Sequence, residues 1–381
     1  FKQKTAYEIK ECDWSSDVCS FRSTGLEQVG FASIHWNQTY VSSSPTPLPP
    51  ACVRALIDIG TNSVKLLVAE VADREVRPLH EESEQTRLGK GFYETHLLQA
   101  GAIHDTAVAV ARFAARAAEF KPSTIRVFAT SAARDAKNQA ELLETVRRVS
   151  GLRVEVISGD QEAEWVYQGV TSDPQLSGHR LLILDVGGGS TEFILGDGAH
   201  KQFRESFPLG SVRLLEQLQP SDPPKPSDLA RARAEVGTFI QSNVVPEVGV
   251  QVGAACGPCW LVGTGGASTI MGRIEGRMNS FDRDRLEGMV LKLDQVRSLV
   301  GRLWALPLAE RRWIIGLPKK RADVILTGAV IYEGVMEQLG FPEMRISTRG
   351  LRYGGLLGSV SPTARRGLRY GGLLGSVSPT A

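Results

Sequence analysis

Short apolar runs separated by turn-forming residues dominate the first half of the chain and predict strands. The runs 53–57 and 64–71 flank a turn of small and polar residues, Gly60 to Ser63, so we expect a strand, a tight loop and a returning strand. β-Branched and aromatic residues predict two further strands, over 125–130 and 154–158. The first half therefore reads as a sheet that begins with a hairpin.

Apolar positions at helical spacing predict helices between these strands. One helix is expected over about 101–121, and another from 134 to about 149. Ser158 and Gln161 have the spacing of a capping box, in which the serine is the N-cap and the glutamine follows three residues later. Glu162 is therefore expected in the first turn of the next helix.

The same strand pattern begins again after a turn-rich stretch. Strands are predicted over 181–185 and 191–196, on either side of a second glycine turn. With an offset of 127 residues this hairpin falls on the first, and the matching pairs are Asp58 and Asp185, Gly60 and Gly187, Ser63 and Ser190, and Leu66 and Phe193. This weak internal duplication suggests two related halves that face each other across a cleft.

The remaining pattern is mostly helical. A third glycine loop over 263–266 follows another apolar strand, and the proline-rich stretch 219–227 is expected to be a surface connection. Helical periodicity extends over about 282–303 and 322–339, and residues 344–348 supply a last strand. The whole pattern predicts an α/β protein.

Both ends of the chain differ from this pattern. The first residues resemble a translated sequencing adaptor and show no sustained period, and the segment 349–364 is repeated letter for letter at 366–381. We expect a non-native or disordered extension and a duplicated, disordered tail around two lobes. The predicted divisions are 1–52 for the extension, 53–171 for the first lobe, 172–358 for the second lobe and 359–381 for the tail.

Composition and charge narrow the class of ligand. The 381 residues include 44 basic and 42 acidic side chains, so no overall positive field attracts nucleic acid or anionic lipid. No apolar run approaches the length of a membrane span, and five cysteines are too few for a disulfide framework. We expect a cytoplasmic protein that binds neither nucleic acid nor membrane and holds any anionic ligand locally.

The two matched hairpins suggest phosphate chemistry. Glycines let backbone N–H groups approach phosphate oxygens, and an aspartate at a strand end binds Mg²⁺ directly or through water. A single glycine turn between strands is more often a plain hairpin. Two in register, each with an aspartate, together with the Gly-Thr-Gly-Gly segment at 263–266, favour a phosphate site.

Seven segments in this order resemble the exopolyphosphatase and guanosine pentaphosphate phosphatase (Ppx/GppA) family. They are ALIDIGTNSVKLLV, TSAARDAKN, VISGDQEAEWVYQGV, LLILDVGGGSTEFILG, FPLGSVRL, LVGTGGAST and STRGLRYGGLLG. The resemblance covers 53 to about 358 and implies the two-lobed actin-like ATPase (ribonuclease H-like) fold, with a mixed sheet flanked by helices in each lobe and the active site in the cleft between them. It implies Mg²⁺, or another divalent cation, as cofactor.

The resemblance assigns roles to residues that match the family's motifs. Glu162 matches the general base that activates water, and Glu192 a glutamate linked to the water or the metal. The metal ligands would be Asp58, Asp185 and Glu192. The phosphate-binding residues would be Gly60, Thr61, Asn62, Ser63, Gly187, Gly188, Gly189, Ser190 and Thr191, with Gly265 and Gly266 in the third glycine segment. Gln161 replaces a glutamate of the family motif, a change that a capping position tolerates.

Arginines are the expected partners of phosphate because a guanidinium binds it through paired hydrogen bonds. Arg134 is the first candidate for a phosphate clamp, and Arg87 and Lys90 are second candidates for the path of a polyanion. The basic cluster Arg311, Arg312, Lys319, Lys320 and Arg321 is interpreted as a solvated helix end rather than as a binding surface. The Cys256 and Cys259 pair precedes a strand and lacks a second pair, which argues against a redox or zinc site.

The resemblance leaves the substrate open. The first hypothesis is an exopolyphosphatase that releases orthophosphate from the ends of inorganic polyphosphate. Guanosine pentaphosphate (pppGpp) 5′-phosphohydrolysis would use the same residues, and a catalytically weak polyphosphate or alarmone-binding regulator is the alternative from another class. A small-molecule kinase fits the SGDQEA segment poorly. A homodimer is also left open.

Overall fold

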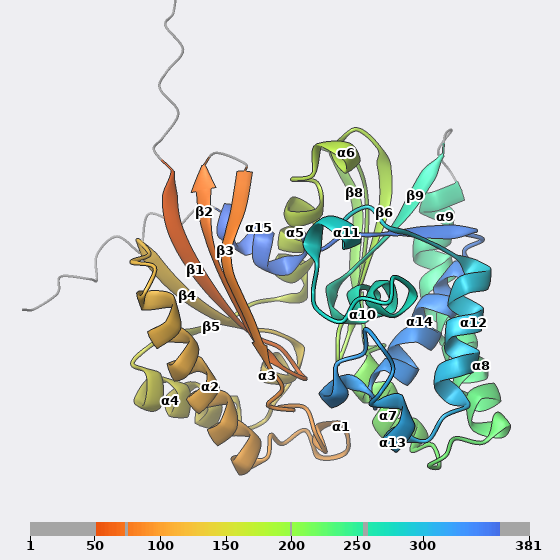
Figure 1. The fold of residues 1–381 in the computed structure, drawn as a ribbon, viewed down its shortest axis with the longest axis horizontal. Coiled ribbons are helices and arrows are strands. Elements are labelled where there is room, and N and C mark those ends of the chain that lie inside the picture. The colour runs from red at the N-terminus through yellow and green to blue at the C-terminus, as the bar shows by residue number, and fades with distance from the viewer. Residues whose placement is uncertain (1–50, 73–74, 199, 254–257, 359–381) are drawn as a thin grey trace, which may run out of the picture. The chain divides into compact units, whose positions relative to one another are not determined.

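The chain forms two mixed β-sheets, each flanked by helices, in a computed structural model that describes residues 51–72, 75–198, 200–253 and 258–358 (Figure 1). The predictions for 1–50 and 359–381 lie outside these residues. The predicted α/β class is confirmed. We call the elements around the first sheet the first lobe and those around the second sheet the second lobe.

The first sheet has the strand order β3-β2-β1-β4-β5, in which β1 is antiparallel to β2 and parallel to β4. Its strands are β1 (Cys52–Ile59), β2 (Val64–Ala72), β3 (Glu75–Glu84), β4 (Thr124–Ala129) and β5 (Val154–Val156). Its helices are α1 (Phe92–Thr95), α2 (Ala100–Ala118), α3 (Ser131–Arg134) and α4 (Gln139–Ser150). The sequence did not predict β3, because this edge strand carries charged residues in place of an apolar alternation.

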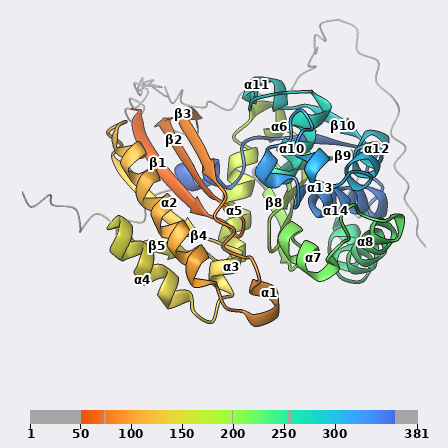
Figure 2. The same cartoon turned by 60° about the horizontal axis from the view of Figure 1, so that its bottom comes forward.

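Both faces of the first sheet are covered, because alternate residues of a strand point to opposite faces. Ile57 of β1 packs with Phe113 of α2 and Leu142 of α4 on one face, where Figure 2 shows both helices. Leu56 packs on the other face with Trp165 of α5 (Gly159–Val170). Leu356 of α15 (Leu351–Leu357) joins the same cluster.

The second sheet has the order β10-β11-β9-β6-β7-β8. Its strands are β6 (Arg180–Val186), β7 (Thr191–Asp197), β8 (His200–Phe207), β9 (Cys259–Thr264), β10 (Val290–Lys292) and β11 (Glu343–Ile346). Its longer helices are α7 (Ser211–Leu218), α8 (Pro226–Phe239), a π-helix (Ile240–Gly249), α10 (Gly265–Glu275), α12 (Leu293–Trp304) and α14 (Ile325–Gln338). The short helices are α6 (Pro174–Ser177), α9 (Val250–Gly253), α11 (Arg283–Leu286), α13 (Leu308–Arg311) and the 3₁₀ turn Lys319–Arg321. Helix α14 is buried almost all round and forms the centre of this lobe's core.

The internal duplication extends through both sheets. Strands β1, β2, β3 and β4 are connected as β6, β7, β8 and β9 are, and β5 and β11 occupy the next position. The pairing of β2 with β3 shifts register between Val68 and Ala69, and that of β7 with β8 shifts between Leu195 and Gly196, again 127 residues later. The predicted offset of 127 therefore holds for two strands and the bulge, whereas the residues of β3 and β8 correspond at an offset of 123.

Helices α5 and α15 connect the two lobes. Tyr167 and Val170 of α5 pack against the second sheet, whereas Trp165 of the same helix packs against the first. Helix α15 follows the last strand of the second sheet, yet it packs on α5 and β1 (Figure 1). The division of the chain at residue 171 remains a prediction. In the structure, α15 lies at the end of the predicted second lobe but packs on the first sheet.

Two predicted helices are interrupted. The helix expected over 134–149 is split because Asn138 exchanges two hydrogen bonds with the backbone of Leu98, and α4 begins only after it. The helix expected over 282–303 is wrong in its first half: Gly288 adopts a φ of 74°, and β10 follows and pairs with β11. In both regions a tertiary contact overrides the local apolar spacing.

Candidate active site

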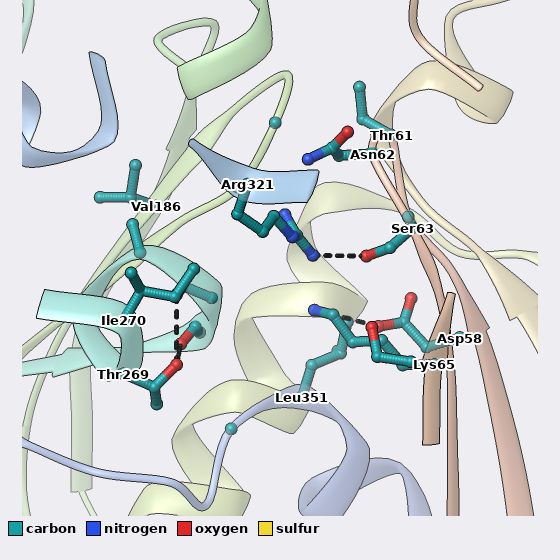
Figure 3. Close-up of a pocket in the computed structure, with 18 of the residues that line it drawn as sticks. Asp58, Thr61, Asn62, Ser63, Lys65, Val186, Thr269, Ile270, Arg321 and Leu351 are labelled. Atoms are coloured by element: carbon teal, nitrogen blue, oxygen red, sulfur yellow. Dashed lines mark hydrogen bonds and ion pairs between the residues drawn. The ribbon is translucent and has the colours of Figure 1, made fainter. Parts of the chain in front are cut away.

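A cavity of about 800 Å³ lies where the glycine turns of both sheets meet. Most of the predicted site residues line it, and part of the set is drawn in Figure 3. Those that line it are Asp58, Gly60, Thr61, Asn62, Ser63, Glu162, Asp185, Gly187, Gly188, Gly189, Ser190, Glu192, Gly265 and Gly266. The lining residues do not include Arg134 or Thr191, nor the second candidates Arg87 and Lys90.

The first and second glycine turns share one backbone geometry. The Gly60 N–H donates to the Ser63 carbonyl at 3.1 Å, and the Gly187 N–H donates to the Ser190 carbonyl at 2.9 Å. Each turn follows a strand that ends in a cavity-lining aspartate. The predicted strand, turn and returning strand are confirmed in both lobes.

The two turns touch each other across the cavity. A methyl group added at Gly188 would lie 2.8 Å from Cβ of Thr61, closer than real Cβ contacts allow. A methyl group at Gly189 would collide with the hydroxyls of Tyr93 and Ser131. These glycines are therefore needed so that the second turn can approach the first lobe.

The third glycine segment is the start of a helix and not a loop. Strand β9 ends at Thr264, the N-cap of α10, and Gly265 is the first helical residue. Gly265 has a φ of 83°, and a side chain there would collide with Asp185. This segment therefore brings backbone close to the aspartate of the second turn.

Glu162 lies at the start of α5, as predicted, with Ser158 as the N-cap. The Ser158 hydroxyl accepts from the Gln161 N–H at 3.1 Å, which confirms half of the predicted capping box. Nη1 of Arg134 donates to Oε2 of Glu162 at 3.1 Å and to the carbonyl oxygen of Ile157 at 3.0 Å. The Arg134 guanidinium therefore holds the glutamate, and its role as a phosphate clamp stays a prediction.

Burial shifts the protonation of the carboxyl groups in the cavity. Burial, together with Glu192, raises the pKa of Glu162 well above its usual value, and Arg134 opposes this shift. Burial and the neighbouring Asp185 raise the pKa of Glu192 to about 7, and burial raises the pKa of Asp185 to about 6. Several buried carboxyl groups in one cavity repel one another when ionised, so the site favours cations.

Hydrogen bonds orient the side chains of Glu192 and Thr191 toward opposite faces of β7. Ser190 and Ser206 both donate to Oε1 of Glu192, at 2.7 and 2.9 Å. Thr191 is fully buried, and its hydroxyl donates to the carbonyl oxygen of Leu209. Because neighbouring strand residues point to opposite faces, Glu192 faces the cavity while Thr191 faces the protein interior.

The sequence reasoning missed Lys65 and placed Arg321 in a solvated basic cluster, yet both side chains line the cavity. Nζ of Lys65 lies 3.9 Å from Oδ2 of Asp58, and Nη2 of Arg321 donates to the Ser63 hydroxyl at 2.7 Å (Figure 3). Burial lowers the pKa of Lys65, and it lowers that of Arg321 to about 10. Lys65 could have been found because it stands opposite Asp58 in the predicted hairpin. Arg321 has no such local signal.

The basic cluster of the sequence is not one solvated helix end. Arg311 is buried and donates to the carbonyl oxygens of Leu303, Leu306 and Ala322, so it is structural. Arg321 points into the cavity, which Lys319 and Lys320 also line. Arg87 forms a 2.8 Å ion pair with Asp323 outside the cavity lining. The cluster therefore contributes both to the core and to the cavity.

The carboxylates fit a magnesium ion that is held largely by phosphate and water. Among the described residues no three or more His, Cys, Asp or Glu side chains converge as a ready metal cluster. Mg²⁺ in phosphate sites usually needs only one or two carboxylates besides water and substrate oxygens. Oδ1 of Asp58 is buried and has no hydrogen-bond partner in the described part of the chain, which suits an inner ligand.

Known proteins share this fold. The Ppx/GppA phosphatase family matches residues 67–362. Exopolyphosphatase 2 of Mycobacterium tuberculosis is 30% identical over 295 residues, which cover 75% of this chain and 90% of the relative. The chain belongs to the Ppx/GppA phosphatase family, and it is therefore an exopolyphosphatase-like phosphatase.

Solved structures agree with this membership. The Aquifex aeolicus member of the Ppx/GppA family has a TM-score of 0.66 at 30% identity, over 81% of this chain and 97% of its own. An exopolyphosphatase from Cytophaga hutchinsonii has a TM-score of 0.72 at 25% identity, over 80% of this chain and 96% of its own. The two sheets match the two-lobed, actin-like structures of the family. In the described ranges no helix is long and apolar enough to cross a bilayer.

Proposed function

We propose that this protein is an exopolyphosphatase that releases orthophosphate from the ends of inorganic polyphosphate in a reaction that requires a divalent cation. The observation that carries the proposal is the meeting of two glycine turns in one cavity with the carboxyl groups of Asp58, Glu162, Asp185 and Glu192. The relative named Exopolyphosphatase 2 supports polyphosphate as the substrate. The cavity residues would equally accept the 5′-phosphates of pppGpp, so the experiment below separates the two substrates.

Glu162 is the proposed general base. Its carboxylate takes a proton from the attacking water while the water oxygen bonds to the terminal phosphorus. The bridging P–O bond breaks, and the shortened polyphosphate leaves with the bridging oxygen and its electron pair. Arg134 keeps the carboxylate aimed at the cavity through its 3.1 Å contact. The raised pKa of Glu162 makes it a stronger base than an exposed glutamate.

The glycine turns are proposed to cradle the phosphates. Backbone N–H groups of the second turn, Gly187 to Ser190, would receive the reacting phosphoryl group, and the first turn and α10 would complete the wall. Asp58, Asp185 and Glu192 would hold the divalent cation, which supplies charge neutralisation on the phosphate oxygens. Lys65 and Arg321 add fixed positive charge beside the same oxygens.

The test is phosphate release from polyphosphate of defined lengths and from pppGpp, with and without Mg²⁺. Glu162→Gln keeps the size of the side chain but cannot accept the proton, so we expect kcat to fall about 100-fold or more. Glu155→Gln is the matched control, because Glu155 is an exposed glutamate of the same lobe that pairs with Arg126. Full activity of Glu162→Gln would remove it as the base. If phosphate is released from pppGpp but not from polyphosphate, pppGpp is the substrate.

A further inference from the structure

Several buried polar atoms that line the cavity lack partners. Oδ1 of Asp58, Nδ2 of Asn62, Oγ of Ser131 and Oγ1 of Thr264 have no hydrogen-bond partner within the described residues. A buried polar group without a partner is costly, so such groups in a native structure call for a ligand or water. Asp58 offers an oxygen to a cation, whereas the other three can donate to an anion.

Ser131 and Thr264 are the members of this set to which the sequence reasoning gave no role in the site, and Ser131 lies in the TSAARDAKN segment. It is only 3% exposed, at the point where β4 gives way to the single turn of α3. Its hydroxyl faces the second glycine turn closely enough that a methyl group on Gly189 would collide with it. The side chain therefore reaches from the first lobe to the phosphate turn of the second.

Three other buried hydroxyls nearby have structural roles, because each of them donates to a backbone carbonyl oxygen. Thr191 donates to the Leu209 carbonyl, Ser211 donates to the Gly187 carbonyl at 3.1 Å, and Thr327 donates to the Ser211 carbonyl at 2.6 Å. Each of these hydroxyls is satisfied by a backbone oxygen. The Ser131 hydroxyl is the same kind of group in the same region, yet it has no partner among the described residues and belongs to a residue that lines the cavity.

We propose that Ser131 is a phosphoryl-binding residue: its hydroxyl donates to an oxygen of the phosphate group held against the second glycine turn. The Asn62 amide donates to the same anion from the first turn. Both groups are neutral donors, so they bind the anion without adding charge that would repel the divalent cation. The identification of this anion as substrate phosphate rests on the proposed function.

The position of Ser131 also ties binding to the approach of the lobes. The hydroxyl belongs to the first lobe and the glycine turn to the second, so the donor set is complete only where Gly189 lies against Ser131. A phosphate group in this place is held by both lobes at once. A bound water that merely fills the space would not give Ser131 any effect on phosphate affinity.

The test uses inorganic phosphate as the probe, because its binding can be measured without turnover. We expect Ser131→Ala to weaken orthophosphate binding in calorimetry about tenfold and to lower kcat/KM for polyphosphate by a similar factor or more. Ser131→Cys, which keeps the volume and weakens the donor, should fall between wild type and alanine. Thr106→Val is the matched control, because it removes a buried hydroxyl bonded to Thr86 away from the cavity.

The outcomes separate the two proposals. If Ser131→Ala lowers only the melting temperature and leaves phosphate affinity unchanged, the residue is structural and this inference is overturned. If phosphate affinity depends on Ser131 while wild type hydrolyses neither polyphosphate nor pppGpp, the binding role stands and the proposed function fails. If Thr106→Val weakens phosphate binding as much as Ser131→Ala does, the effect is general destabilisation and the inference is also overturned.

Discussion

The two hairpins that form the cavity have the same backbone and opposite chemistry. In the first, Asp58 stands opposite Lys65 across β1 and β2. In the second, Asp185 stands opposite Glu192 across β6 and β7, at the same register and 127 residues later. One lobe therefore places a cation beside its aspartate, and the other places a second carboxylate there.

Because of this difference, the two lobes contribute side chains of opposite charge to the site. The lysine compensates Asp58 and presents positive charge to phosphate oxygens, whereas Asp185 and Glu192 create a negative region that attracts a cation. The turns also differ in their side chains, because Thr61 and Asn62 of the first turn correspond to Gly188 and Gly189 of the second. Gly188 faces the side chain of Thr61 from the first turn, and Gly189 faces Tyr93 and Ser131. A duplicated scaffold can thus form one asymmetric site.

The largest effect is expected when the second hairpin is made to copy the first. Glu192→Lys replaces a carboxylate with a cation beside Asp185, so cation binding and hydrolysis should both be lost, with kcat/KM falling at least ~1000-fold. Steady-state phosphate release and calorimetry with Mg²⁺ measure the two losses. Glu205→Lys, on an exposed position of the neighbouring strand, should keep the activity.

Removal of the cation from the first hairpin should cost less. Lys65→Met keeps the length of the side chain and its contacts but deletes the charge, so we expect kcat/KM for polyphosphate to fall ~100-fold. Lys65→Arg should retain part of the activity because it keeps the charge. The exposed Lys137→Met serves as control. Equal activity of Lys65→Met and wild type would show that the lysine only supports the fold.

A smaller effect is expected from filling the contact between the turns. Gly188→Ala should lower kcat/KM about tenfold, because its methyl group meets Thr61 and forces the turns apart. The double variant Thr61→Gly with Gly188→Ala removes the Cβ that the new methyl group meets and should recover part of the loss, so the two changes should be non-additive. Gly178→Ala adds a methyl group where nothing lies within 4 Å and should be neutral. Strict additivity would contradict direct contact of the turns.

The smallest expected effect is on stability against pH, measured by denaturant unfolding with a chelator present. Asp185 and Glu192 have raised pKa values in the folded protein, about 6 and 7. The unfolded chain loses these protons near pH 4 and the folded protein only near pH 6 to 7, so their contribution to stability is full below about pH 4 and is lost between pH 4 and 7. We expect unfolding free energy to fall by about 1 kcal/mol or more over that range. Glu192→Gln should flatten the profile, and Mg²⁺ should reverse the fall in wild type.

The sequence predicted those parts of the fold and site that depend on local pattern. The hairpins, the Ser158 cap and the position of Glu162 follow from apolar alternation and spacing, and the structure confirms their geometry. The roles assigned to the site residues remain predictions. Lys65 could have been predicted as a site residue, because it lies opposite Asp58 in the predicted hairpin.

Other parts depend on contacts between distant segments. Arg321 reaches Ser63 across 258 residues of sequence, and Ser131 reaches the second turn only because the lobes meet. The split at Asn138 comes from its bonds with Leu98, which no local spacing could indicate. The sequence predicts a loop at the third glycine segment. In the structure its strand leads directly into a helix whose first residue has a positive φ.

The packing of α15 sets an order of events during synthesis of the chain. Leu56 belongs to β1, the first strand of the described residues, yet it packs with Tyr353 and Leu356, which are made roughly 300 residues later. The guanidinium of Arg54 likewise donates to the Leu356 carbonyl at 2.8 Å. One face of the first sheet therefore has only α5 to cover it while the second lobe is translated. At the rate at which ribosomes elongate chains, that interval lasts about 15 to 60 seconds.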